Sequence, residues 1–174
     1  LHAPAAAGNR FMLLRRRRVW SATQQQWMGW ERKRGKLHEL NRLLRGATDT
    51  SFVDASGSAP DVPTGVRYVI TLDADTRLPR DAARRLIGKP SHPLNRPSAG
   101  KGIYALDAFE SALAGRVADG TLLSHDLFEG IFARAGLVSD IEVVEEFPER
   151  YDVAAARQHR WARGDWQLLP WLLG

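Results

Sequence analysis

A short apolar run that ends in two aspartates constrains this chain most. Residues 66–79 read VRYVITLDADTRLP, and the first seven are mostly β-branched, aromatic or apolar, which is the pattern of a short buried strand. Asp73 and Asp75 follow it directly. Ligands of open α/β sheets gather beyond the carboxyl ends of strands, and two carboxylates there suit a hard divalent cation that carries a diphosphate. The same two residues also suit a plain turn, because aspartate is favoured in turns.

The pattern along the chain alternates between strands and helices, which predicts an α/β fold. Strands are expected within residues 10–20, from 66 to the DAD turn, and within 137–147. Helices are expected over residues 36–45, 79–87, 107–114, 127–136 and 152–173, the last one long or broken. Irregular segments are expected at residues 27–34, 54–65 and 88–102.

Helix boundaries are also readable in the sequence. Leucines 37, 40, 43 and 44 form one amphipathic face, and Gly46 stands where that helix should stop. Asp107 with Glu110, and Asp126 with Glu129, have the spacing of a capping box at the start of two further helices.

Composition narrows the function classes. The 174 residues suffice for one domain with a core, and the lack of cysteine excludes disulfides and cysteine-ligated metals. No apolar stretch is long enough to span a bilayer. Residues 1–46 hold eleven Lys and Arg against two Glu, a basic half that could face nucleic acid, a membrane surface or a diphosphate. A start at leucine suggests a piece of a longer chain.

Four local motifs occur in order along the chain. They are KRGKLHELN at 33–41, DAD at 73–75, SHDLFEG at 124–130 and RQHRWARGDWQ at 157–167. Together they resemble the processive inverting glycosyltransferases related to cellulose synthase, which carry a "KxGxLN"-like turn, a DxD, an acidic base and a "QxxRW" helix. The residues of these motifs and of the segments around them, which together cover most of the chain, resemble even more closely the glycosyltransferase domain of cyclic β-1,2-glucan synthase.

The resemblance implies a nucleotide-sugar transferase (GT-A type) fold, with a mixed sheet flanked by helices. It implies that Asp73 and Asp75 hold Mg²⁺ or Mn²⁺ and, through it, the diphosphate of UDP-glucose. Asp126 matches the catalytic base, which takes the proton of the acceptor hydroxyl during inversion. Candidates for donor contacts are Lys33, Arg34, Lys36, Arg160 and Trp161. Asp126 also suits a plain helix cap, and the tryptophans also suit a core.

The resemblance further implies a large bacterial parent at the cytoplasmic face of the inner membrane, with the remaining domains and a glucan acceptor as partners. The chain is then one partial transferase domain, with a donor-side part at 1–53, the DxD strand and helix at 54–97, and the base and RW helix at 98–174.

Two departures from the pattern stand out. Arg157 replaces the leading glutamine of "QxxRW", with Gln158 one step later, and a segment expected before GKGIY is missing. The amino-terminal strands that grip the uridine base in relatives are missing as well, so the expected scaffold is incomplete and the chain could be inactive. Two alternatives remain: a related inverting synthase of another β-linkage, and a non-catalytic basic domain that binds anions through Arg15–Arg18. Nucleic acid is the less favoured partner.

Overall fold

The computed structural model describes residues 11–22, 24–88, 102–116, 126–133, 136, 138 and 140–173. Its contacts divide the chain into two compact units, Leu1–Val66 and Arg67–Gly174, and each is described by itself. Both units combine helices with short strands, so the expected mixed α/β class is confirmed. The three-part division of a single domain stays a prediction.

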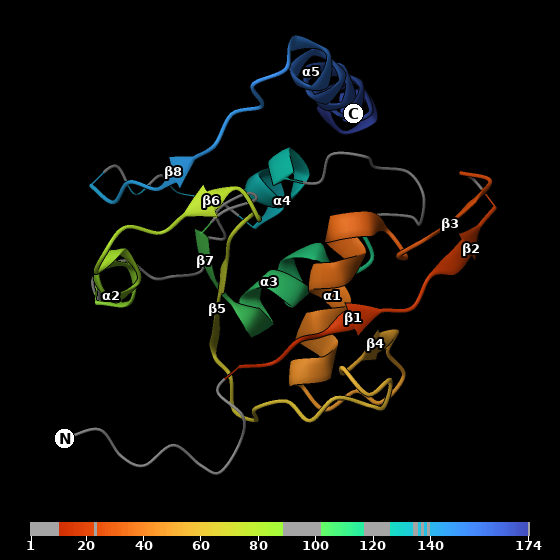
Figure 1. The fold of residues 1–174 in the computed structure, drawn as a ribbon, viewed down its shortest axis with the longest axis vertical. Helices are drawn as coiled ribbons and strands as arrows, with labels where there is room; N and C mark the ends of the chain where they lie inside the picture. The colour runs from red at the N-terminus through yellow and green to blue at the C-terminus, as the bar shows by residue number, and fades with distance from the viewer. Residues whose placement is uncertain are drawn as a thin grey trace. The chain divides into compact units, whose positions relative to one another are not determined.

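The described residues of the first unit form one long helix and two pairs of short strands (Figure 1). Its elements are β1 (Arg15–Arg16), β2 (Val19–Ser21), β3 (Gln26–Met28), α1 (Arg32–Leu44) and β4 (Phe52–Val53). Strand β1 pairs antiparallel with β4, and β2 pairs antiparallel with β3. The single strand expected within residues 10–20 is therefore two short strands with different partners.

The irregular segment expected at residues 27–34 is confirmed only for residues 29–31, since Trp27 and Met28 lie in β3 and residues 32–34 lie in α1. Trp27 lies in β3, directly opposite Trp20 of β2, and the two rings meet edge to face with centroids 6.0 Å apart. Such a cross-strand aromatic pair stabilises a hairpin, and a local pattern of residues does not reveal it because the partner lies on another strand. Helix α1 then begins at Arg32, four residues before its expected start, and buries Leu37 and Leu43.

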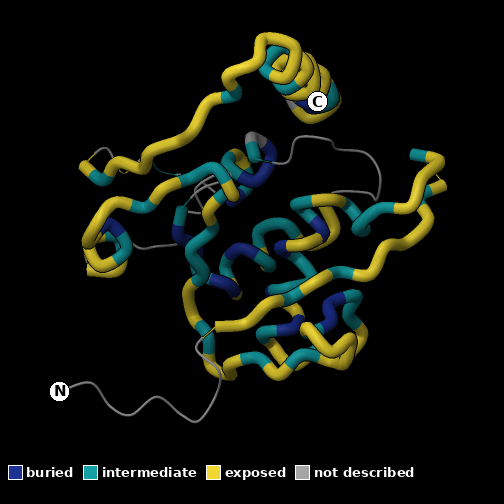
Figure 2. Tube along the Cα trace, viewed as in Figure 1, coloured by how far each residue is buried: buried dark blue, intermediate teal, exposed yellow. Residues whose placement is uncertain are grey.

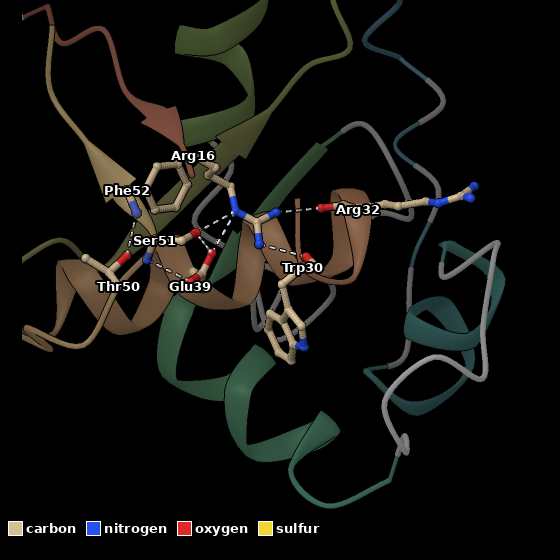
Figure 3. A network of polar contacts seen from close by, with 7 residues as sticks. All are labelled: Arg16, Trp30, Arg32, Glu39, Thr50, Ser51 and Phe52. Atoms are coloured by element: carbon tan, nitrogen blue, oxygen red, sulfur yellow. Dashed lines mark hydrogen bonds and ion pairs between the residues drawn. The ribbon is translucent and has the colours of Figure 1, made fainter. Parts of the chain in front are cut away.

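One arginine of the basic run is an internal structural residue. The Arg16 guanidinium donates to the carbonyl oxygens of Trp30 at 2.7 Å and Arg32 at 2.9 Å, and Nε lies 2.7 Å from Oε2 of Glu39 (Figure 3). Glu39 in turn accepts hydrogen bonds from the backbone N–H and the hydroxyl of Ser51. The Arg16 and Glu39 side chains are only 9% and 11% exposed. This network ties β1, α1 and the start of β4 together.

The second unit contains more helix, and its strands again pair in twos (Figure 1). Its elements are β5 (Tyr68–Thr71), β6 (Thr76–Arg77), α2 (Ala82–Ile87), β7 (Gly102–Ala105), α3 (Leu106–Leu113), α4 (Asp126–Phe132), β8 (Val144–Glu145), α5 (Tyr151–Trp166) and α6 (Leu169–Leu172). Strand β5 pairs antiparallel with β7, and β6 pairs antiparallel with β8. The described strands thus form separate antiparallel pairs rather than the expected mixed sheet.

The strand that precedes the DAD turn is half exposed rather than buried. Tyr68 of β5 is 41% exposed, whereas Ile103 and Tyr104 on the partner strand β7 are 5% and 2% exposed. Tyr104 stacks on Phe109 of α3, with ring centroids 4.4 Å apart. The apolar character of β5 was read correctly, but burial depends on what packs on each face of a strand.

Several element boundaries differ from the expectations. Among the described residues of the range 137–147, the expected strand covers only Val144–Glu145, and the helix expected at 79–87 begins at Ala82. Asp107 does not cap α3: the N-cap is Ala105, without a side-chain cap hydrogen bond, and Asp107 lies in the first turn, where a carboxylate favours the helix dipole. The carboxyl-terminal helix is broken into α5 and α6, as one of the two expectations had it.

A small aromatic core joins α4 to the junction of α5 and α6. Phe128 of α4 and Leu168 are 1% and 2% exposed, and Leu113 and Phe132 pack against them. Trp171 of α6 meets the Phe128 ring edge to face at 5.3 Å. Most of α5 itself is exposed, as Figure 2 shows, so this helix is anchored mainly at its carboxyl-terminal end.

Candidate functional site

The DAD segment forms a tight turn between β5 and β6. The backbone N–H of Thr76 donates to the carbonyl oxygen of Asp73 at 3.0 Å, which closes the turn. The carbonyl oxygen of Asp75 accepts from the backbone N–H of Glu146 at 3.1 Å, beside the β6–β8 pair. Asp73 and Asp75 are both partly exposed. The two aspartates therefore shape a turn, and both residues remain partly exposed to solvent. A structural role in the turn is compatible with a role as cation ligands.

Arg157 of α5 reaches the DAD turn with its side chain. Its Nη1 donates to Oδ2 of Asp75 at 3.2 Å, and the two side chains are 21% and 32% exposed. The same guanidinium lies over the Trp161 ring, with Cζ 4.8 Å from the ring centroid. Asp75, Arg157 and Trp161 therefore form one contiguous contact series that joins two of the predicted motifs.

The helical period explains why these α5 residues act together. Arg157, Arg160, Trp161 and Gly164 are three or four residues apart and share one face of the helix. Gly164 is buried, Trp161 is 44% exposed and Arg160 is exposed. Arg160 and Trp161 thus lie on the face of α5 from which Arg157 reaches the DAD turn.

Asp126 is the first residue of α4 and is partly exposed. Its helix is held by Phe128, which packs on Leu168 and Trp171 just beyond the end of α5. The segment from Arg157 to Trp171 therefore contacts the DAD turn near its start and the helix of the candidate base at its end.

The basic candidates at residues 33–36 belong to the first unit. Arg34 forms an ion pair with Glu31, Nη2 to Oε2 at 2.7 Å, and lies over the Trp30 ring at 5.8 Å. Its side chain is 16% exposed, so the guanidinium is engaged locally. Lys36 is exposed and Lys33 is partly exposed on the first turns of α1. Of the three, Lys36 is the most accessible to an anion.

The donor set of the DAD turn suits a magnesium-type ion. Among the described residues no three His, Asp or Glu side chains gather into a closed metal cage. Mg²⁺ commonly needs only one or two protein carboxylates when substrate phosphates complete its shell. Asp75 holds a cationic group, the Arg157 guanidinium, at Oδ2.

Two residues near the turn were not among the predicted site residues. Arg157 was read as a departure from the motif, although its spacing from Trp161 on a helix could have placed both on one face. The Oγ1 atom of Thr76 is buried and makes no hydrogen bond with the described part of the chain. No sequence signal marks that hydroxyl, since its burial depends on the surrounding fold.

Comparison with known proteins confirms the resemblance to cyclic β-1,2-glucan synthase. Over 94% of its length, the chain is 44% identical to the cyclic β-(1,2)-glucan synthase NdvB of Rhizobium meliloti (strain 1021). The chain spans only 8% of that relative's length, in line with a piece of a larger protein. The alignment runs over 225 positions, more than the 174 residues here, so the relative holds residues without a counterpart in this chain. Protein-family profiles give no match.

In the parts of the chain that the structure describes, none of the helices has the length and apolar character needed to cross a membrane.

Proposed function

We propose that this chain is the donor-binding and catalytic part of a glucan synthase that transfers glucose from UDP-glucose, with inversion, onto a growing β-1,2-glucan. The observation that carries the proposal is the contact between Arg157 and Asp75, which joins the RW helix to the DAD turn. Strong identity to a cyclic β-(1,2)-glucan synthase supports the product class. A GT-A type arrangement of the complete domain is part of the same proposal.

In this proposal Asp73 and Asp75 hold Mg²⁺ or Mn²⁺, which would neutralise the negative charge that develops on the leaving diphosphate. Arg160, an exposed residue on the α5 face that carries Arg157, supplies a guanidinium for phosphate oxygens, and Trp161 supplies an apolar ring surface for a sugar. Lys33, Arg34 and Lys36 are donor contacts in the proposal, and the Arg34 side chain must leave its ion pair with Glu31 to take part.

Asp126 acts as the general base in this proposal. Asp126 lies at the start of α4, the helix that Phe128 anchors; the residue is partly exposed, although its Oδ1 atom is buried. It removes the proton of the acceptor hydroxyl while that oxygen attacks the donor carbon. Loss of a positioned base typically lowers the rate by about 10²- to 10⁴-fold. Asp126→Asn is therefore expected to abolish detectable transfer in the longer parent protein and to leave UDP binding unchanged.

The parent, in this proposal, is a large bacterial protein at the cytoplasmic face of the inner membrane. Its other domains complete the sheet, the uridine-binding side and the acceptor side. A related inverting synthase with a different linkage would use the same residues, and analysis of the linkages in the product distinguishes the two.

The alternative of a non-catalytic basic domain is weakened by the burial of Arg16. Within the run Arg15–Arg18, that guanidinium is engaged by Glu39 and by two backbone carbonyls, so it is not available to an external anion. The remaining members of the run present fewer charges than the sequence suggested.

Calorimetry of UDP binding with and without Mn²⁺ tests the proposal on this chain. Asp75→Asn should lose the Mn²⁺-dependent part of the binding. Asp165→Asn, which removes an exposed carboxylate on α5, is the matched control and should bind like the wild type. Equal UDP affinity of the wild type with and without Mn²⁺, in a folded sample, would overturn the metal-dependent donor site.

A further inference from the structure

Arg157 occupies the position at which the resembled motif has a glutamine, and it is the α5 side chain that contacts the DAD turn. We propose that Arg157 is a positioning residue that holds Asp75 while no cation is bound, and that releases Asp75 to the cation and turns to the donor diphosphate. This inference rests on the proposed function. It adds that Arg157 and the cation replace each other at Oδ2 of Asp75.

The geometry favours a hold that can be broken. The Nη1–Oδ2 distance is 3.2 Å, longer than the 2.7–2.9 Å that is typical of a strong charge-assisted hydrogen bond. Both side chains are also partly exposed, at 21% and 32%, so water screens the pair. A guanidinium and a divalent cation at the same oxygen repel each other. Binding of the cation at Oδ2 therefore favours movement of Arg157 away from that oxygen.

The Trp161 ring gives the released guanidinium a place to stay close to the site. Arg157 lies over that ring already, with Cζ 4.8 Å from the centroid, and this contact does not depend on Asp75. From that position the planar guanidinium can donate two parallel hydrogen bonds to phosphate oxygens. A glutamine amide carries no positive charge and cannot form this charged pair of bonds. Glutamine at this position would neither compete with the cation nor attract the diphosphate.

Two other ion-paired arginines among the described residues lack this combination. Arg16 is held by several partners in a nearly buried network. Arg77 lies two residues after Asp75, but it pairs with Glu146, an exposed residue that is not a predicted metal ligand. Arg157 touches a predicted metal ligand, Asp75.

The test uses the whole chain, its Arg157→Gln variant and the control Arg163→Gln, which removes the same charge from an exposed position on α5. Free Mn²⁺ is measured by electron paramagnetic resonance in the absence of nucleotide. UDP binding is then measured by calorimetry at saturating Mn²⁺. Arg157→Gln should bind Mn²⁺ about three- to fivefold more tightly, because an exposed ion pair of modest strength is gone. It should bind UDP about five- to tenfold more weakly, because a charged donor is lost.

A spectroscopic readout follows the movement itself. The indole N–H resonance of Trp161, assigned through Trp161→Phe, should shift when Mg²⁺ is added to the wild type, because the guanidinium above the ring is redistributed. The same resonance should respond much less in Arg157→Gln. Circular dichroism establishes that each variant is folded.

Each outcome has one meaning. Equal or weaker Mn²⁺ binding by Arg157→Gln, with Mn²⁺-dependent UDP binding intact in the wild type, overturns the exchange and leaves the proposed function standing. Failure of both proteins to bind Mn²⁺ without nucleotide overturns the exchange. UDP binding by the wild type that does not depend on Mn²⁺ overturns the proposed function as well, whereas Mn²⁺ binding by the variant alone supports the exchange. If Arg157→Gln does not fold, Arg157→Lys replaces it. Lysine should keep the Mn²⁺ affinity within about twofold and lower the UDP affinity about threefold, and unchanged UDP affinity would overturn the inference.

Discussion

Gly35 of α1 packs directly against the carbonyl oxygen of Trp30: a Cβ on Gly35 would lie 2.1 Å from that oxygen. Glu31 and Arg32 have φ angles of +50°, so the chain folds back sharply as it enters the helix. The same carbonyl oxygen accepts a hydrogen bond from Arg16. A side chain at position 35 must therefore displace backbone that the network around Arg16 holds in place.

The first prediction concerns this contact. Gly35→Ala should lower the free energy of unfolding by about 2–3 kcal/mol, as overpacking against backbone does. Urea denaturation measures the change. Gly29→Ala is the control, because its Cβ would only approach the end of the flexible Arg16 side chain at 3.3 Å. An equal loss in both variants would show that the Trp30 carbonyl is not the cause.

The second prediction concerns the ion pair of Arg16 and Glu39. Arg16→Met should cost about 3 kcal/mol of stability, because it leaves the nearly buried Glu39 carboxylate without its cation. Adding Glu39→Leu should restore part of the loss, since no unpaired charge then remains. Thermal denaturation of the single and double variants measures both steps. Arg17→Met, at an exposed position, should change little.

The third prediction concerns the anchor of α5. Phe128→Ala should destabilise the second unit by about 3–5 kcal/mol, because a fully buried ring is replaced by a cavity. The near-ultraviolet circular dichroism of the tryptophans should weaken as Trp171 loses its aromatic contact. Phe147→Ala, at a residue 65% exposed, is the control and should leave stability nearly unchanged.

The fourth prediction is a pH dependence at the end of α1. The pKa of Asp49 lies below its ordinary value, mainly because the Arg42 side chain donates a hydrogen bond to its carboxylate. A hydrogen bond from the Asp49 backbone lowers this pKa further, by a smaller amount. Because the folded-state pKa is the lower one, the stabilisation is present above the unfolded-state pKa, about 4, and is lost as the pH falls through the folded-state value. Thermal denaturation between about pH 6 and pH 2 measures it.

The matched comparison is Asp49→Asn. This variant should show a shallower loss of melting temperature with acid than the wild type. The difference should shrink at high salt, because the pair is exposed and screened. Identical pH profiles would show that other carboxylates account for the acid sensitivity.

Much of the local structure was predictable because it depends on local spacing. The leucine pattern of α1 and the stop at Gly46, whose φ is +90°, were both correct. The break between α5 and α6 was one of two expectations. The start of α1 and the β2–β3 hairpin were missed, because they depend on the left-handed turn at Glu31 and on a pair of tryptophans from two strands.

The sequence by itself determined the mixed α/β class, the main helices and the residues that resemble a glucan synthase, since these follow from period, turn chemistry and motif order. Only the tertiary structure decided that Arg16 is internal and that Arg157, read as a departure, contacts Asp75. Arg157 and Asp75 are 82 residues apart in the chain. A charged side chain can lie in water or reach an ion-pair partner, and its own sequence neighbours do not distinguish these states. The packing of Phe128 and Leu168 anchors the end of the helix that carries Arg157.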